Sequence, residues 1–501
     1  MAGLATLAFF AVVAFPRAAI PLIDGDVWWH IRAGMEIAAT RQVATTDQWT
    51  IAGLGMPWTS QDWLSNVLVA SVFGIGSWGS TLLSVLFSAM VMGGLVLLWR
   101  AIGARGDSSG WLGRIVWLAV GLTVAGPTLG VRVQVVDLPL TAAAVLSLWS
   151  YLRHRRRRTL AWLPLLALVW ANLHAGWLLL FLIGGAVVVG ESVDRALRRQ
   201  LHPEPLAWRD IGWLVAALVV AGGAIAINPN GPALYLYPLE TSGIQAHRDF
   251  LAEWQPPDLA TLPGQLFIGF ILVGVLPALA IGWRLMRLAD ALVLVGLTIM
   301  AATAARFLLV AGPIGAAVIA VTLGRALAGT RIGRGVAPLL NRMSRPPRST
   351  GLAGVNLALA AVLIVAGLVV VGARASPSAE RQAIAEHMPV AAVDWMLSHE
   401  PGERAFNTYA WGGYLGFRRP ELPTYIDGRS DIYGDAPIRS YADAISLRSD
   451  PGALLDAQRI DHVLFNTDHP FADWLNANAE WERVYSDPLA SVWIRIGADH
   501  E

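Results

Sequence analysis

Apolar segments long enough to cross a bilayer recur along this chain of 501 residues. A membrane-spanning helix needs roughly 20 predominantly apolar residues. Eleven segments approach or reach this length, at 3–22, 79–99, 111–130, 137–152, 159–173, 175–193, 210–227, 264–283, 289–304, 307–325 and 351–373. Only 15% of the residues are charged, whereas soluble domains average about 25%. The sequence therefore predicts a polytopic α-helical membrane protein with about 11 transmembrane helices.

Arginine clusters occupy alternate connections between these segments. The clusters are Arg100, Arg105 and Arg114, then Arg153 to Arg158, then Arg195, Arg198, Arg199 and Arg209, then Arg284 and Arg287, and finally Arg325 to Arg348. Because basic loops stay in the cytoplasm, this pattern predicts a cytoplasmic N-terminus. The connections 23–78 and 228–263 and the tail from residue 374 are then extracytoplasmic.

Two segments test this topology. Residues 64–78 are apolar but short and interrupted by glycine, and a span there would turn five arginine clusters outward. We therefore expect a helix that lies on the outer leaflet or dips into it. Residues 3–22 lack a basic start and a small-residue cleavage site before Asp24, so we expect them to be retained as a span and not removed as a signal peptide.

The tail differs in composition from the rest of the chain. Residues 375–501 contain 20 acids and 10 arginines, a net charge of about −10, and the preceding part carries about +11. Helical stretches at 379–399, 437–457 and 470–480 alternate with strand-like runs at 424–426, 462–465 and 491–494. We predict a transmembrane domain at 1–373, with a long outer loop at 23–78, and a small extracytoplasmic α/β domain at 374–501.

The first outer loop opens on two aspartates, Asp24 and Asp26, directly after the first apolar segment. An amphipathic helix is predicted to follow, with His30 and Arg32 within two turns of the acids. In the structural interpretation, one aspartate caps this helix. In the functional interpretation, a carboxylate takes a proton from an attacking hydroxyl and Arg32 holds a phosphate.

Further polar side chains lie near the outer ends of the predicted spans or in the outer loops. Candidates for substrate binding are Gln61, Asp62, Arg132, His174, Glu253 and Arg306, together with His30 and Arg32. Ionisable groups at membrane depth are costly and indicate function. Arg306 is the only charged residue between Asp290 and Arg325. The structural alternatives are snorkelling for the arginines, a hydrogen-bonded helix end for His174, and a helix start capped by Ser60 for Gln61 and Asp62.

Signatures of soluble cofactors are absent from the sequence. It contains no Walker A loop, no dinucleotide-binding fingerprint and no G-x-S-x-G, and it has no basic domain suited to nucleic acid. His30, His174, His247 and Glu253 have side chains that could hold a divalent metal, but their spacing matches no metal signature. The sequence assigns no cofactor and leaves a divalent metal open.

Four strings together resemble a known pattern: Asp24 to His30, Trp170 to His174, Asn228 to Gly231 and Tyr425 to Arg429. The chain resembles the GT-C class of membrane glycosyltransferases, which includes protein O-mannosyltransferases and lipid A aminoarabinose transferases, and is similar to glycosyltransferase-like bacterial membrane proteins. The resemblance implies a polyprenyl-phosphate sugar donor and inverting transfer to a hydroxyl of a lipid, glycan or protein, at the outer face of the bacterial inner membrane. It also implies that Asp24 or Asp26 is the base and that Arg132 and Arg306 hold the donor phosphate.

Two other functions fit the same residues. The first is a non-catalytic binder or translocase of lipid-linked glycans, which would relocate the lipid without moving its sugar. The second is a scaffold subunit of an envelope-polysaccharide complex, which would dock its partner on the acidic tail.

Overall fold

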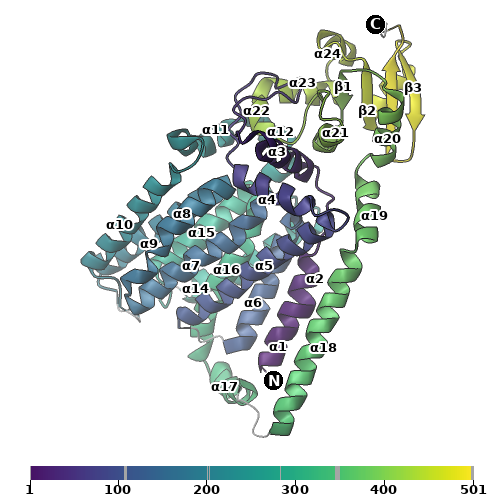
Figure 1. Ribbon diagram of the computed structural model, residues 1–501. Helices are drawn as coiled ribbons and strands as arrows, with labels where there is room; N and C mark the ends of the chain where they lie inside the picture. Colours follow the sequence, from purple (N-terminus) through teal and green to yellow (C-terminus); the bar gives the residue numbers. More distant parts are fainter. Residues whose placement is uncertain are drawn as a thin grey trace.

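The computed structural model describes residues 2–106, 110–199, 201, 204–282, 284–344 and 350–497. Residue 283 of the predicted span 264–283, and Arg345 and Arg348 of the last arginine cluster, lie outside the described residues. The chain forms a long helical bundle with a smaller α/β part at one end (Figure 1).

Eight helical stretches of the described chain are long and apolar enough to cross a membrane. They are α5 (Gly79–Ala104), α6 with η2 (Gly110–Thr128), η3 with α7 (Val133–His154), η5 with α9 (Ala175–Ala196), α10 (Trp208–Ile225), α13 to α14 (Leu262–Gly282), η9 with α16 (Ala305–Ala328) and α18 (Thr350–Arg374). The chain is a multi-pass helical membrane protein. Three other predicted spans form shorter helices, at α1 to α2 (Ala2–Ala18), α8 (Trp162–Leu173) and α15 (Leu288–Thr303), so the number eleven stays a prediction.

Helix α16 (Leu308–Ala328) lies at the centre of the bundle. In its most apolar stretch of 18 residues, 89% of the residues are buried. It crosses α6 where Gly312 meets Gly121, and a Cβ on either glycine would fall within 2.8 Å of the other's carbonyl oxygen. Small residues let helix backbones approach in this way inside a membrane. By contrast, only 11% of the residues in the corresponding stretch of α18 are buried, so most of the surface of α18 is left for lipid.

Most of the arginine clusters lie at the end of the bundle opposite the α/β part. There Arg105 forms a buried ion pair of 2.5 Å with Asp290, and Arg287 pairs with Glu191. Figure 1 places the N-terminus and α17 (Arg331–Ser344) at this end. The loops 23–78 and 228–263 and the tail share the other end, which is the relative arrangement that the arginine pattern requires.

Two helices of the first outer loop cross closely. Helix α3 (Asp26–Thr40) begins next to the position predicted for the amphipathic helix, and α4 (Trp63–Phe73) corresponds to the short apolar segment at 64–78. A Cβ on Gly34 of α3 would lie 2.0 Å from the carbonyl oxygen of Asn66 in α4. Only glycine at this position permits the crossing.

The tail folds into a four-stranded sheet with surrounding helices. Its order is β1-β2-β4-β3, where β1 (Ala405–Asn407) pairs parallel with β2 (His462–Asn466), and β4 (Ala490–Arg495) pairs antiparallel with β2 and β3 (Trp481–Ser486). The strands predicted at 462–465 and 491–494 are confirmed as β2 and β4. The run at 424–426 forms only isolated bridges through Thr424, and β1 and β3 were not predicted.

The helices of the tail are shorter than the predicted stretches. They are α19 (Pro377–His387), α20 (Val390–His399), α21 (Gly412–Arg418), α22 (Ser430–Tyr433), α23 (Asp435–Ile445), α24 (Pro451–Ala457) and α25 (Pro470–Ala477), with the 3-10 turn η10 (Tyr409–Trp411) before α21. Pro389 separates α19 from α20, and Pro451 begins α24. Each proline lacks the N–H that a continuous helix needs, so 379–399 and 437–457 are both divided.

The tail and the first outer loop share one hydrophobic core, although they are distant in sequence. Trp29, Trp49 and Trp58 of the loop pack with Phe406 and Tyr425 of the tail. The backbone N–H of Ile51 donates to the carbonyl of Thr424 at 2.8 Å. The boundary predicted near residue 374 therefore separates two regions of sequence, but not two separate cores.

Arg429 is almost fully buried in this shared core, with a 1% exposed side chain. It pairs with Asp47 at 2.9 Å and with Asp427 at 2.7 Å, between the rings of Trp49 and Trp58. The guanidinium thus links the first outer loop to the tail by pairing with one buried acid from each.

We expect Arg429→Gln to lower the free energy of unfolding by about 3–5 kcal/mol, because it leaves two carboxylates buried without a counter-charge. Chemical denaturation in detergent, followed by tryptophan fluorescence, measures the change. Arg448→Gln is the control, since Arg448 pairs with Asp443 in an exposed position and should leave the unfolding midpoint unchanged. Equal effects of the two variants would contradict the structural role given to Arg429.

Candidate active site

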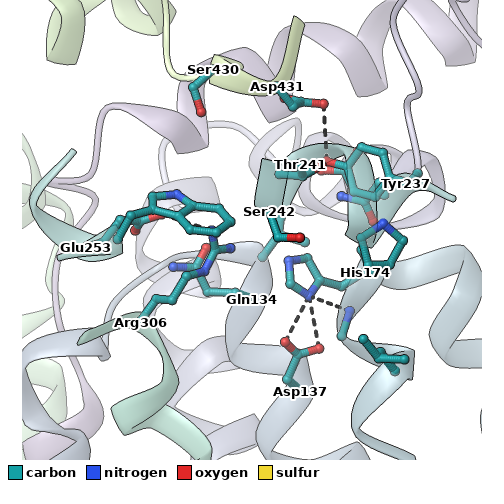
Figure 2. A pocket seen from close by; sticks show the side chains of 18 of the residues that line it. Gln134, Asp137, His174, Tyr237, Thr241, Ser242, Glu253, Arg306, Ser430 and Asp431 are labelled. Atoms are coloured by element: carbon teal, nitrogen blue, oxygen red, sulfur yellow. Dashed lines mark hydrogen bonds and ion pairs between the residues drawn. The ribbon is translucent and has the colours of Figure 1, made fainter. Parts of the chain in front are cut away.

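A cavity of about 350 Å³ lies between the outer ends of the spans and the loops that cover them. Its polar wall combines side chains of the first loop, the second outer loop, the span ends and the tail (Figure 2). Much of its apolar wall comes from the spans and includes Leu178, Leu179, Leu182, Met300, Leu309 and Val310. The cavity can therefore accept a molecule that is polar at one end and apolar at the other.

Four predicted residues form a chain of alternating charge that reaches one side of this cavity through Glu253 and Arg306. Arg132 lies 2.8 Å from both Asp24 and Glu253. The second oxygen of Glu253 lies 3.5 Å from Arg306, whose guanidinium stacks 4.3 Å from the ring of Trp254. Glu253, Trp254 and Arg306 line the cavity. Residues that are as far apart in the sequence as 24 and 306 are thus joined in one network.

The charged residues of this network shift one another's pKa values. Burial opposes the charged form of Arg132, but Asp24 and Glu253 outweigh it and raise the pKa of Arg132 above its usual value. Burial also opposes the charged form of Glu253, but Arg306 and Arg132 lower the pKa of Glu253 below the usual carboxyl value. Arg132 and Glu253 are therefore both charged at neutral pH.

The two aspartates of the first loop have different positions. Asp24 pairs with Arg132 and accepts a hydrogen bond of 2.9 Å from the backbone N–H of Asp26, at the start of α3. Asp26 lines the cavity. Burial and the neighbouring charge of Asp24 raise the pKa of Asp26 well above its usual value. The structural interpretation as a helix-start residue therefore suits Asp24, and the cavity-facing carboxylate is Asp26.

His30, Gln61 and Asp62 also line the cavity. His30 Nδ1 lies 2.6 Å from Asn66 Oδ1 and 3.3 Å from Asp62. Burial lowers the pKa of His30 to about 3 and raises that of Asp62 to about 6. His30 is therefore neutral at physiological pH. Separately, Gln61 Oε1 is buried without a hydrogen-bond partner among the described residues.

Arg32 lies outside the cavity lining. Its guanidinium donates to the backbone carbonyls of Gly416 at 3.1 Å and Pro420 at 2.8 Å, and pairs with Glu36. The polar face of α3 is covered by the tail, so Arg32 is only 8% exposed. Its position is that of a link between α3 and the tail, and we leave it out of the proposed phosphate site.

His174 lines the cavity beside Asp137, a residue that the sequence analysis did not select as a site residue. His174 Nδ1 lies 2.9 Å from Asp137 Oδ2, and Trp170 Nε1 donates to Asp137 Oδ1 at 2.7 Å. Asp137 is the first residue of α7 (Asp137–His154). The only feature of the sequence that could have indicated Asp137 is its place at the start of a helix. Acidic residues are common at helix starts whether or not they have a function.

The tail supplies the roof of the cavity, which sequence reasoning missed. Gly428 to Asp431 line it together with Tyr237, Thr241 and Ser242 of the second outer loop. The Tyr237 hydroxyl donates to Asp431 Oδ2 at 3.1 Å (Figure 2). Burial raises the pKa of Asp431 above its usual value. Asp431 had a sufficient local explanation as a turn residue, and nothing in its neighbourhood indicates its contact with Tyr237.

Metal-binding geometry is not found in the described part of the chain, where no group of three His, Asp or Glu side chains is placed to hold an ion. His247 lies buried against Trp254, with ring centroids 4.9 Å apart, and does not line the cavity with His30 and His174. The four residues considered for a metal are therefore not gathered around one point.

No protein-family model matches the chain, and no curated protein matches its sequence. Solved structures are similar in fold. The archaeal oligosaccharyltransferase AglB from Archaeoglobus fulgidus, in complex with an inhibitory peptide and a dolichol-phosphate, matches 99% of this chain over 75% of its own, with a TM-score of 0.54 and 12% identity. ArnT from Cupriavidus metallidurans, bound to undecaprenyl phosphate, matches 99% over 97%, with a TM-score of 0.50 and 12% identity. The resemblance to GT-C glycosyltransferases is thereby confirmed at the level of the fold.

Proposed function

We propose that this protein transfers a sugar from a polyprenyl-phosphate donor to a hydroxyl acceptor (a lipid, glycan or protein) at the outer face of the bacterial inner membrane. The observation that supports this most directly is the charge network from Asp24 to Arg306 at the polar end of a cavity with an apolar wall. A lipid phosphate bears the same combination of a charged head and an apolar chain.

Arg306 is the proposed phosphate ligand, with Arg132 behind it. The 3.5 Å contact between Arg306 and Glu253 is longer than the 2.8 Å contacts of Arg132, so Arg306 is the less firmly engaged of the two. An arriving phosphate would compete with Glu253 for this guanidinium. The similar AglB and ArnT structures contain dolichol-phosphate and undecaprenyl phosphate, which supports a donor of this class.

Asp26 is the proposed base. The acceptor hydroxyl oxygen attacks the anomeric carbon, Asp26 takes the hydroxyl proton, and the bond from the anomeric carbon to the phosphate oxygen breaks. A single displacement of this kind inverts the anomeric centre. The electron pair leaves on the lipid phosphate, where the arginines stabilise the growing negative charge. Because the pKa of Asp26 is raised, its ionised form is a stronger proton acceptor than an ordinary aspartate.

The non-enzymatic functions use the same surfaces differently. A binder or translocase would hold the donor in this cavity without breaking its glycosidic bond. A scaffold would use the acidic tail as a docking surface, and deletion of residues 379–501 would remove that surface. The shared core of the tail and the first loop makes that deletion disruptive, so single substitutions in the cavity are the better discriminator.

The first test measures sugar transfer by purified protein in lipid nanodiscs. The substrates are polyprenyl phosphates that each carry one tritiated sugar, such as glucose, mannose, galactose or a pentose, with an envelope extract as acceptor. We expect wild-type protein to move the label off one donor. Asp26→Asn should reduce kcat about 10²–10⁴-fold, and Arg306→Gln about 10²–10³-fold.

Asp394→Asn is the matched control, because Asp394 pairs with Arg418 on the surface of the tail, with 56% of its side chain exposed. This variant should transfer sugar at the wild-type rate. If wild-type protein binds the lipids and leaves every label on its polyprenyl phosphate, the binder or translocase is the correct function.

The pH dependence of stability provides a second test of Asp26. The native state holds the Asp26 proton more tightly than the unfolded state does, since the folded pKa is raised. The stabilisation that Asp26 contributes is therefore fully present below the ordinary carboxyl pKa. It is lost as the pH rises through the pKa of Asp26 in the folded protein. We expect the unfolding temperature of wild-type protein to fall relative to that of Asp26→Asn as the pH rises above the ordinary carboxyl pKa. A constant difference between the two proteins would show that Asp26 has an ordinary pKa.

A further inference from the structure

Two turns at the cavity have the same construction. His174 ends α8 in an extended conformation (φ −165°, ψ 151°) and is followed by the 3-10 turn η5 (Ala175–Trp177) and helix α9 (Leu178–Ala196). Ala304 ends α15 in a similar conformation (φ −151°, ψ 125°) and is followed by η9 (Ala305–Phe307) and α16. One turn presents His174 to the cavity and the other presents Arg306.

The apolar wall begins immediately after each of these turns. Leu178 and Leu179 follow His174, and Leu309 and Val310 follow Arg306. His174 and Arg306 are therefore the polar groups nearest in sequence to the parts of α9 and α16 that would contact a lipid chain. A donor with its phosphate on Arg306 would have its sugar in the polar region that His174 also faces.

Asp137 fixes the orientation and tautomer of the His174 ring. Its carboxylate lies 3.0 Å and 2.9 Å from Nδ1 through its two oxygens and accepts the Trp170 indole N–H at 2.7 Å. A carboxylate with these neighbours requires a proton on Nδ1. The backbone N–H of Gly176 is also placed to donate to Nδ1, at 3.2 Å, but two carboxylate oxygens on the same nitrogen favour a proton there. In the neutral imidazole with this tautomer, the free lone pair is on Nε2.

This lone pair is available to a ligand. Figure 2 shows the ring of His174 with one nitrogen toward Asp137 and the other directed into the cavity. Among the described residues, no hydrogen bond to Nε2 is present, and the His174 side chain is 14% exposed. A Cβ on Gly176 would lie 2.1 Å from Asp137 Oδ1, so glycine at this position is required for the carboxylate to reach the ring.

We propose that His174 is a specificity-determining hydrogen-bond acceptor for one hydroxyl of the donor sugar, and that Asp137 is its positioning residue. This inference rests on the proposed function, because it requires a sugar on the lipid phosphate. A fixed lone pair accepts from a hydroxyl in one direction only. A sugar whose hydroxyl points elsewhere leaves the imidazole unpaired inside the cavity, and this unpaired group costs binding energy.

The experiment compares two ligands that differ only in the sugar. Dissociation constants are measured in nanodiscs for sugar-free polyprenyl phosphate and for the polyprenyl-phosphate sugar that wild-type protein turns over. His174→Phe removes the lone pair and keeps an aromatic ring. We expect this substitution to weaken binding of the sugar-bearing lipid about 10- to 100-fold and to leave the affinity for the sugar-free lipid unchanged.

Asp137→Asn tests the tautomer directly. The side-chain amide introduced by this substitution would donate to Nδ1, so the proton of His174 moves to Nε2 and the cavity faces a donor in place of an acceptor. We expect the affinity for the sugar-bearing lipid to fall at least tenfold and its preference over a sugar epimer to shrink. ¹⁵N-histidine NMR spectra report the tautomer independently of any activity, with His174→Phe identifying the resonance among the 10 histidines.

Asp394→Asn is the control here as well, because Asp394 pairs with Arg418 on the surface of the tail and does not line the cavity. It should retain both affinities. The inference would be overturned if His174→Phe lost affinity for both lipids equally, or for neither. In either case, turnover by wild-type protein would still support the proposed function. If wild-type protein turned over no polyprenyl-phosphate sugar, the proposed function and this inference would both fall.

Discussion

The structure depends on a very close approach between the first outer loop and the tail. A Cβ on Gly25 would lie 2.0 Å from the carbonyl oxygen of Ala410, and a Cβ on Gly413 would lie 2.5 Å from that of Gly25. On the other side of Asp26, a Cβ on Gly428 would lie 1.7 Å from its Oδ1. Real Cβ atoms do not occupy such positions, so glycine at these three places lets the tail enclose the aspartate pair. The roof of the cavity and the position of Asp26 follow from this contact.

Charge compensation explains why so many ionisable groups can lie together at the membrane end. Asp24, Arg132, Glu253 and Arg306 alternate in sign, so the network is close to neutral before any ligand binds. Arg429 offsets part of the negative charge of Asp47 and Asp427. A buried charge without a partner costs several kcal/mol. A bound phosphate would add negative charge to the first network, and the weakest existing contact, from Arg306 to Glu253, is where it could be accommodated.

The sequence predicted the parts of the site that depend on membrane depth. Arg132, His174 and Arg306 were each selected because they lie near the outer end of a span, and residues at one depth in a bundle are brought near one another. Arg32 shows where this reasoning ends. Its helix face has the pattern of a solvent-exposed surface, but Gly416 and Pro420 cover it from a position more than 380 residues away in the chain. Such coverage leaves no mark in the local sequence.

Asp137, Tyr237 and Asp431 escaped prediction for a related reason. Each has a sufficient local role, as a helix-start acid or as a polar loop residue, and its cavity contact comes from an element distant in sequence. The same limit applies to the sheet, where the edge strand β3 (Trp481–Ser486) has two adjacent exposed charges, Glu482 and Arg483, and resembles a polar loop. Patterns of hydrophobicity record how much of a residue is buried, but not which other residue buries it.

The division of the cavity suggests how its two substrates would be kept apart. The apolar wall and the His174 and Arg306 turns belong to the bundle. The roof belongs to the second outer loop and the tail, where Tyr237 and Asp431 meet. In the proposed function, a hydroxyl acceptor approaches beneath that roof and the donor approaches along the spans. Asp26 lies where the first loop touches the tail, so the proposed base is held at the boundary between the two approaches.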